Sequence, residues 1–181
     1  MKKYITIIAS FIVLFASNSL SAQSAANELV SRLANAIRSH NSLEVSFTYQ
    51  TIGDTKQSDE IKEGHAYFQG ESYKILLADQ HTISNGTTKW SYLVDDEEVM
   101  VGNVTDDDNP FKILDELERN SSGFTPTVDA KGNLKKLEIE MDEGVKMILN
   151  ITEMKFDQVY PDSFFTFDQK AYPHVDIIDM R

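Results

Sequence analysis

The chain contains no cysteine among its 181 residues. It therefore does not rely on disulfides, even in an oxidising compartment. The same absence excludes a lipid anchor on an N-terminal cysteine. Tryptophan is represented once, by Trp90.

Long apolar runs are also scarce. The only one is Tyr4–Phe15, about 12 residues, which is too short to span a bilayer comfortably. Lys2 and Lys3 precede it, and the small residues of Ser17–Ala22 follow. This order is typical of a secretory signal peptide over 1–22, cleaved after Ala22, and a retained membrane anchor is the alternative. We expect an exported protein whose mature chain, 23–181, forms a single domain.

Basic residues are outnumbered by acidic ones, 17 to 29, which gives a formal charge of −12. Removal of Lys2 and Lys3 with the signal peptide would make this −14. An acidic surface disfavours nucleic acid and anionic lipid headgroups as partners.

Catalytic and metal-binding motifs are missing as well. The four histidines, at 40, 65, 81 and 174, show no metal-ligand spacing. There is no Gly-x-Ser-x-Gly elbow and no phosphate-binding glycine loop. The acidic runs Asp95–Glu98 and Asp106–Asp108 lack the oxygen-ligand spacing and the glycine of a calcium loop. We expect no metal, no cofactor and no enzyme activity, although a hydrolase site assembled from distant strands stays open.

Most of the secondary-structure signals in the sequence are those of β-strands. In Thr82–Val104, Asn85-Gly86 predicts a tight hairpin, because both residues tolerate positive φ. The strand Lys89–Val94 follows, and an acidic turn at Asp95–Glu97 leads into the next strand. Upstream, Leu43–Gln50 alternates apolar and polar residues, as a half-buried strand does.

The remaining strands are predicted from short alternating segments between turn residues. Gly70 divides Ile61–Gln69 from Ser72–Ala78, and Ser121–Pro126 is predicted as a loop. The later strands are predicted at Lys135–Met141, Val145–Thr152 with a continuation at Met154–Val159, and Phe164–Phe167, before Tyr172–Ile178 closes the chain.

Two helices complete the pattern. Ala25–Ser39 has apolar residues at helical spacing, and Asn109-Pro110 begins a short helix that ends near Asn120. Its apolar residues are Phe111, Ile113, Leu114 and Leu117. The predicted fold is mainly β with α, a single curved antiparallel sheet that forms an incomplete β-barrel capped by helices. Such a sheet is either filled by its own side chains or holds one small apolar ligand.

The order of these segments resembles the LolA family of periplasmic lipoprotein carriers. Leu43–Gln50 (LEVSFTYQ) is similar to the first strand of the family, and Gly64–Phe68 with Tyr73–Leu77 to its next hairpin. Asn85–Tyr92 resembles the family's turn-Gly-x-x-x-Trp-x-Tyr signature, and Asn109–Leu114 the Pro-Phe-x-x-Leu start of its mid-chain helix. Phe165-Thr166-Phe167, followed by Pro173-x-Val175-x-Ile177, resembles its closing strand.

The resemblance implies a LolA/LolB-like half-open barrel that binds lipoprotein acyl chains in an apolar cavity under a helical lid. In the family an Arg-Pro pair after the second strand holds the lid shut, and here Gln69-Gly70-Glu71 stands in that place. The helix with Phe111, Ile113, Leu114 and Leu117 is the expected lid. Cavity-lining residues are expected among Phe47, Tyr49, Tyr73, Ile75, Trp90, Tyr92, Phe165 and Phe167.

The implied partners are acylated lipoproteins, an inner-membrane ABC transporter that loads the carrier and an outer-membrane acceptor. The implied location is the periplasm, and a monomer is expected. The alternatives are an outer-membrane-side lipoprotein acceptor and a non-lipoprotein lipid-binding or sensor module on the same curved sheet.

Overall fold

The structure is a computed structural model that describes residues 28, 31, 34–35, 38–53, 58–105, 124–130, 133–140 and 145–181. The predicted signal peptide lies outside the described residues. So does the predicted lid helix with Phe111, Ile113, Leu114 and Leu117.

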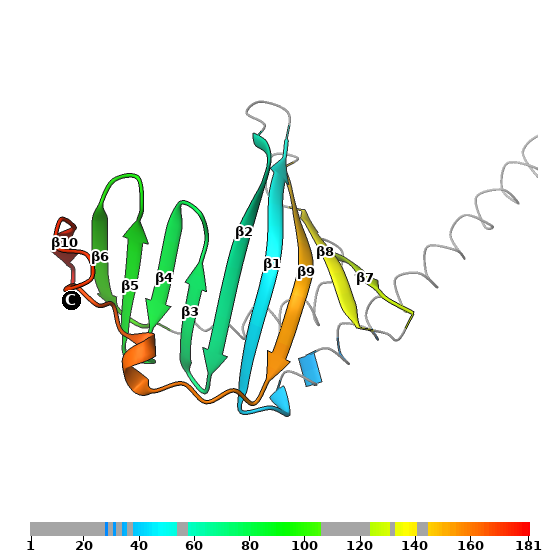
Figure 1. Ribbon diagram of the computed structural model, residues 1–181, viewed down its shortest axis with the longest axis horizontal. Helices are drawn as coiled ribbons and strands as arrows, with labels where there is room; N and C mark the ends of the chain where they lie inside the picture. Colours follow the sequence, from blue (N-terminus) through cyan, green and yellow to red (C-terminus); the bar gives the residue numbers. More distant parts are fainter. Residues whose placement is uncertain are drawn as a thin grey trace, which may run out of the picture.

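The described residues form ten strands, which make up one mixed sheet (Figure 1). In chain order they are β1 Ser42–Ile52, β2 Ser58–Gln69, β3 Ser72–Leu76, β4 Gln80–Ser84, β5 Thr88–Leu93, β6 Glu98–Asn103, β7 Phe124–Val128, β8 Leu134–Glu140, β9 Lys146–Phe156 and β10 Asp176–Asp179. Their order across the sheet is β10-β6-β5-β4-β3-β2-β1-β9-β8-β7. The sheet is twisted and open, with β10 and β7 at its two ends, which confirms the predicted mainly-β single-sheet fold.

The first six strands form the predicted meander, in which each strand pairs with its predecessor. At the Asn85-Gly86 turn, Gly86 has φ of 87°, and the Asn85 side-chain oxygen accepts hydrogen bonds from the N–H groups of Thr87 and Thr88. Gly70, between β2 and β3, has φ of 59°. Both predicted hairpins are confirmed, because each glycine occupies a left-handed conformation that a side chain would strain.

The second half of the sheet differs from the prediction in two details. β9 is one continuous strand that joins the two predicted stretches, and its pairing with β1 shifts register between Ser46 and Phe47. The predicted loop Ser121–Pro126 is wrong from Phe124 onward, because Phe124–Val128 is strand β7. Pro126 is tolerated there because β7 is an edge strand, where a missing N–H breaks no ladder on the open side.

The C-terminal prediction also needs correction. Phe164–Phe167 is not a strand: Asp162–Phe165 forms a 3₁₀ helix, η4, directly after Pro161, whose φ of −69° suits a helical start. β10 pairs with β6 in parallel, so the sheet is not wholly antiparallel. Local alternation gives no information on strand direction, which a crossover connection sets.

Helical structure is described only in part. Positions 28, 31, 34, 35 and 38 are helical, within the predicted helix Ala25–Ser39, and Ala34 is fully buried. The N–H of Ser39 donates to the carbonyl of Asn35 at 3.0 Å. These positions confirm a helix but do not establish the predicted helical cap. Among the described residues, no helix is long and apolar enough to cross a membrane.

Candidate functional site

The strand register divides the side chains of the sheet between two faces, because directly opposed residues on neighbouring strands point to the same side. Phe47 lies opposite Gly64 on β2 and opposite Ile151 on β9. We call the side that carries these residues the Phe47 face. On the other side, Ile83 lies opposite Trp90, which in turn lies opposite Val101. We call this side the Trp90 face.

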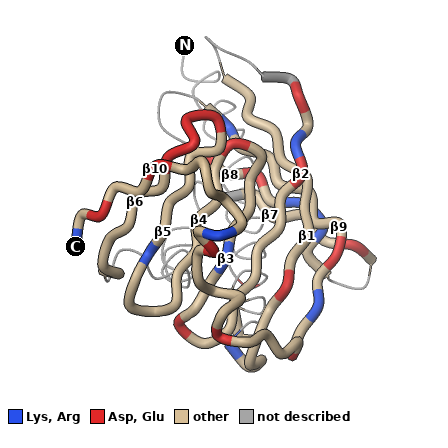
Figure 2. The backbone as a smooth tube through the Cα atoms, turned by 60° about the vertical axis from the view of Figure 1, so that its left-hand side comes forward, with Lys and Arg blue, Asp and Glu red and all other residues tan. Residues whose placement is uncertain are grey.

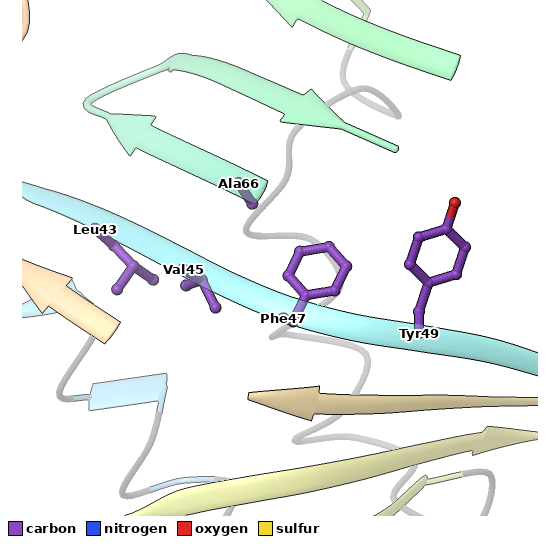
Figure 3. Close-up of a cluster of buried hydrophobic side chains, with 5 residues drawn as sticks. All are labelled: Leu43, Val45, Phe47, Tyr49 and Ala66. Atoms are coloured by element: carbon purple, nitrogen blue, oxygen red, sulfur yellow. The ribbon is translucent and has the colours of Figure 1, made fainter. Parts of the chain in front are cut away.

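The Phe47 face is apolar along the middle of the sheet. Its buried centre is shown in Figure 3 and comprises Leu43, Val45, Phe47, Tyr49 and Ala66. Partly buried side chains pack around this centre: Phe68, Ile75, Leu77, Leu149, Ile151, Met154 and Phe156. Leu137 and Ile139 of β8 continue the same face through their pairing with Leu149 and Met147 of β9. One apolar surface therefore spans β3, β2, β1, β9 and β8.

Two contacts fix the aromatic residues of this face. The Phe47 ring lies over Gly64, where a Cβ atom would come within 2.5 Å of the ring. The Tyr49 hydroxyl accepts a hydrogen bond from the Ala78 N–H at 3.1 Å. This hydrogen bond gives the one side-chain polar atom of the apolar centre a partner.

The Trp90 face holds a second, separate apolar cluster on β4, β5 and β6. Its buried members are Ile83, Tyr92, Val99, Val101 and Phe167, with Trp90, Val94 and Val175 packed against them. Phe167 belongs to the segment after η4, and its ring centroid lies 5.9 Å from that of Tyr92. The C-terminal segment therefore covers this cluster with its own side chains.

Tyr160 fastens the start of that segment to the Trp90 face. Its backbone N–H and C=O both bond to the Gln69 side-chain amide, each at 3.0 Å. Its hydroxyl donates to the Glu44 carboxylate at 2.5 Å, and this bond, with a second from Lys155, lowers the pKa of Glu44. Burial and the same bond raise the pKa of the Tyr160 phenol. The ring also stacks on Phe164, with centroids 4.7 Å apart.

The structure therefore separates the predicted lining residues into two groups. Phe47 and Tyr49 are in the buried centre of the Phe47 face, and Ile75 packs against it. Tyr73, which is 4% exposed, lies opposite Phe68 on the same side. Trp90, Tyr92, Phe165 and Phe167 belong to the Trp90 side.

The predicted set also omits several members of the Phe47 face. Leu43 and Val45 share the alternation of Phe47 and Tyr49 along β1, and that pattern could have identified them. Leu149, Ile151 and Met154 could not be found so directly, because the register shift between β1 and β9 changes which residues of β9 face the centre.

A pocket of about 320 Å³ opens at one end of the Phe47 face. It lies where the chain passes from the helical segment into β1. Leu43 and Phe68 form its apolar wall, and the rest of the lining is Arg38, His40, Asn41, Ser42 and Gly70. The Nδ1 atom of His40 lies 2.7 Å from the Oδ2 atom of Asp157, and the His40 ring stacks on Phe156. The end of β9 and the residue after it therefore contact this end of the face.

The curated relatives found by sequence comparison are outer-membrane lipoprotein carrier proteins. The chain is 27% identical over 208 aligned residues to an outer-membrane lipoprotein carrier protein of Francisella tularensis subsp. tularensis, and the alignment covers 99% of this chain and 98% of the relative. The corresponding protein of Francisella tularensis subsp. holarctica gives the same values. No family model matches the chain.

Among solved structures, an uncharacterized conserved protein from Thermus thermophilus has a TM-score of 0.52 at 9% identity. The match covers 86% of this chain and 99% of that protein, and it shows a shared fold. A LolA superfamily protein from Nitrosomonas europaea gives a TM-score of 0.44 at 12% identity, over 78% of this chain and 97% of its own.

The near full-length carrier relatives confirm the resemblance to the LolA family that the sequence predicts. These relatives are named as carriers rather than enzymes.

Proposed function

We propose that this protein is a periplasmic carrier that binds the acyl chains of lipoproteins over the Phe47 face and shuttles them from the inner to the outer membrane. The observation that carries the proposal is the apolar surface that continues across five strands, from β3 to β8. The near full-length relatives are outer-membrane lipoprotein carrier proteins, which supports lipoproteins as the cargo.

The composition of this face suits acyl chains. Exposure of an acyl chain to water costs about 0.8 kcal/mol per CH₂ group, so a multiply acylated anchor needs an apolar cover in transit. Leu149, Ile151 and Met154 are only partly buried, which leaves apolar area for a ligand to cover. Met147 and Met154 add unbranched side chains that adapt to ligands of different shape.

A carrier must also release its cargo. In this proposal the helix with Phe111, Ile113, Leu114 and Leu117 is a lid that occupies the apolar face between rounds. It competes with the acyl chains and so lowers their net affinity. Gln69-Gly70-Glu71 stands where the family has its Arg-Pro latch, and within it the Gln69 side chain binds the backbone of Tyr160 on the Trp90 face. Closure of the lid is therefore proposed to depend on the apolar contacts of the lid itself.

The remaining parts of the proposal follow from the carrier role. The signal sequence 1–22 directs export and is removed, and the monomer works in the periplasm. An ABC transporter in the inner membrane loads it, and an acceptor at the outer membrane unloads it.

The test compares neighbouring residues of β9 that point to opposite faces. Ile151→Glu places a charge on the Phe47 face, and Asn150→Glu places the same charge on the Trp90 face. Each protein is purified from the periplasm without detergent and weighed intact under native conditions. We expect a bound acylated peptide or lipoprotein on the wild type and on Asn150→Glu, and none on folded Ile151→Glu. Bound phospholipid or fatty acid would mean that the cargo is a lipid other than a lipoprotein. A wild-type protein that is purified without ligand, and that takes up no lipoprotein offered in micelles, would refute the carrier role.

A second test addresses the lid. Phe111→Glu and Leu114→Glu should weaken the hold of the lid on the apolar face, so the affinity for acyl chains should rise while the far-ultraviolet spectrum stays unchanged. Binding at the wild-type level in both variants would refute the assignment of this helix as the lid.

A further inference from the structure

Within the described part of the chain, strand β10 is the last strand at one end of the sheet, and β6 is its only neighbour. The N–H group of Asp176 donates to the carbonyl of Glu97, in the turn before β6, at 2.9 Å, and that of Met180 donates to Val101 of β6 at 2.8 Å. Because successive N–H groups of a strand point to opposite sides, those of Ile177 and Asp179 point away from β6. The outer edge therefore presents backbone donors and acceptors that another strand could bind.

Apolar side chains accompany this edge. All four residues of β10 are exposed, with Ile177 39% and Ile178 43% accessible, and Met180 beyond them is 63% accessible. Ile177 lies opposite Val99 and Ile178 opposite Met100, so the two isoleucines project to opposite faces of the sheet. A strand added beside β10 would cover both of them.

The edge is also strongly acidic. Asp176 lies opposite Glu98 and beside the turn Asp95–Glu97, and Figure 2 shows these acids gathered next to β10. Arg181 binds Asp179 at 2.6 Å. Asp176 and the acids of the turn have no salt-bridge partner within the part of the chain that the structure describes. A single arginine thus offsets little of the negative charge along this edge.

We propose that the outer edge of β10 binds an extended segment of a partner protein in which two apolar residues lie between two basic ones. The backbone of that segment would pair with Ile177 and Asp179, its apolar residues would cover the isoleucines, and its basic residues would meet Asp176 and Asp179. The pattern reads the same in both directions, so parallel and antiparallel addition both satisfy it.

A second copy of this chain fits the edge less well than a basic segment. It would bring its own Asp176 and its own acidic turn to the same place, and like charges on adjacent strands are destabilising. The proposal concerns a partner surface and goes beyond the acyl-binding role. It lies at the end of the sheet away from the buried centre of the Phe47 face, so it can fail without affecting the proposed cargo.

The probe is a short synthetic peptide that contains Lys-Val-Val-Lys, added to the full mature protein. Backbone amide exchange is followed by NMR. We expect the amides of Ile177 and Asp179 to exchange about ten-fold more slowly with saturating peptide. Asp176→Lys should weaken peptide binding about five-fold or more, because it converts a cross-strand attraction into a repulsion. Glu60→Lys, an exposed acid on β2, makes the same charge change elsewhere and should have little effect.

The matched control peptide carries N-methyl groups on its two valines, so it keeps the charge but loses the backbone donors. Weaker binding of this peptide supports strand addition. Equal binding of both peptides, without protection of Ile177 and Asp179, would mean adsorption to an acidic surface and would overturn the proposal. The protein is also examined without peptide. If it forms dimers at high concentration, and Asp176→Lys makes these dimers more stable, the occupant of the edge is a second copy of the chain, and the proposal of a basic partner is overturned.

Discussion

Phe165 offers the sharpest test of the separation between the two faces. Its side chain is 1% exposed, and its ring centroid lies 5.2 Å from that of Phe164 and 6.0 Å from that of Tyr160. Phe165→Ala removes a fully buried ring from the Trp90 side, which costs about 3–5 kcal/mol, and for a domain of this size that lowers Tm by about 6–20 °C. Since the ring does not reach the Phe47 face, acyl binding by the folded variant should stay within about two-fold of the wild type.

The assay pairs thermal unfolding with titration of a fluorescent fatty acid well below the lowered Tm. Val159→Ala serves as the control, because Val159 is 92% exposed and its loss should change stability by less than about 0.5 kcal/mol. A Phe165→Ala variant that unfolds like the wild type would refute the packing argument. A stable variant with strongly weakened binding would place Phe165 in the ligand site, against the separation of faces.

Three further predictions concern single contacts. Gly64→Ala should destabilise the fold by about 1–3 kcal/mol in urea unfolding, because its Cβ would meet the Phe47 ring at 2.5 Å; an unchanged midpoint would contradict this. Gln69→Ala should speed amide exchange at Tyr160 and cost about 1–3 kcal/mol, because it leaves both backbone groups of Tyr160 without their partner. The pKa of Glu44 is lowered in the folded state, so its contribution to stability is present above its unfolded pKa, near 4.3, and is lost as pH falls through the folded value. Between about pH 5 and pH 3, the free energy of unfolding of Glu44→Gln should therefore fall by less than that of the wild type. Equal decreases would refute the assignment of this pH dependence to Glu44.

Local sequence signals predicted the hairpins and the individual strands well. Asn85-Gly86 and Gly70 each predict a turn, and the structure places both glycines, though not Asn85, in the left-handed region. Alternation along Leu43–Tyr49 correctly predicted a strand with one buried face, because period two is a property of a single strand and needs no partner.

The relation between strands was harder to predict. Alternation along the chain puts Phe47 and Trp90 in one predicted lining, yet the register places them on opposite faces of the sheet. The phase of each strand relative to the next depends on the length of every turn between them, and one residue of error reverses the face. The parallel pairing of β10 with β6 depends likewise on a crossover that no local pattern records.

The 3₁₀ helix at Asp162–Phe165 shows a different limit. Its aromatic residues have high strand propensity, but Pro161 sets a helical start, and the rings of Phe164 and Phe165 pack on the Trp90 face through tertiary contacts. Tertiary packing therefore overrides local preference here, as it often does for aromatic residues.

The central claim is that acyl chains bind on the Phe47 face, and the single tryptophan allows a direct measurement. Two proteins are compared: the wild type, whose Trp90 lies on the opposite face, and Trp90→Phe combined with Leu149→Trp, which moves the fluorophore to a partly buried position on the Phe47 face. Each is titrated with a fatty acid brominated along its chain, since bromine quenches tryptophan only at close range. The account predicts strong quenching in the relocated variant and little in the wild type. Strong quenching of Trp90, with none in the relocated variant, would contradict it and place the ligand on the other side of the sheet.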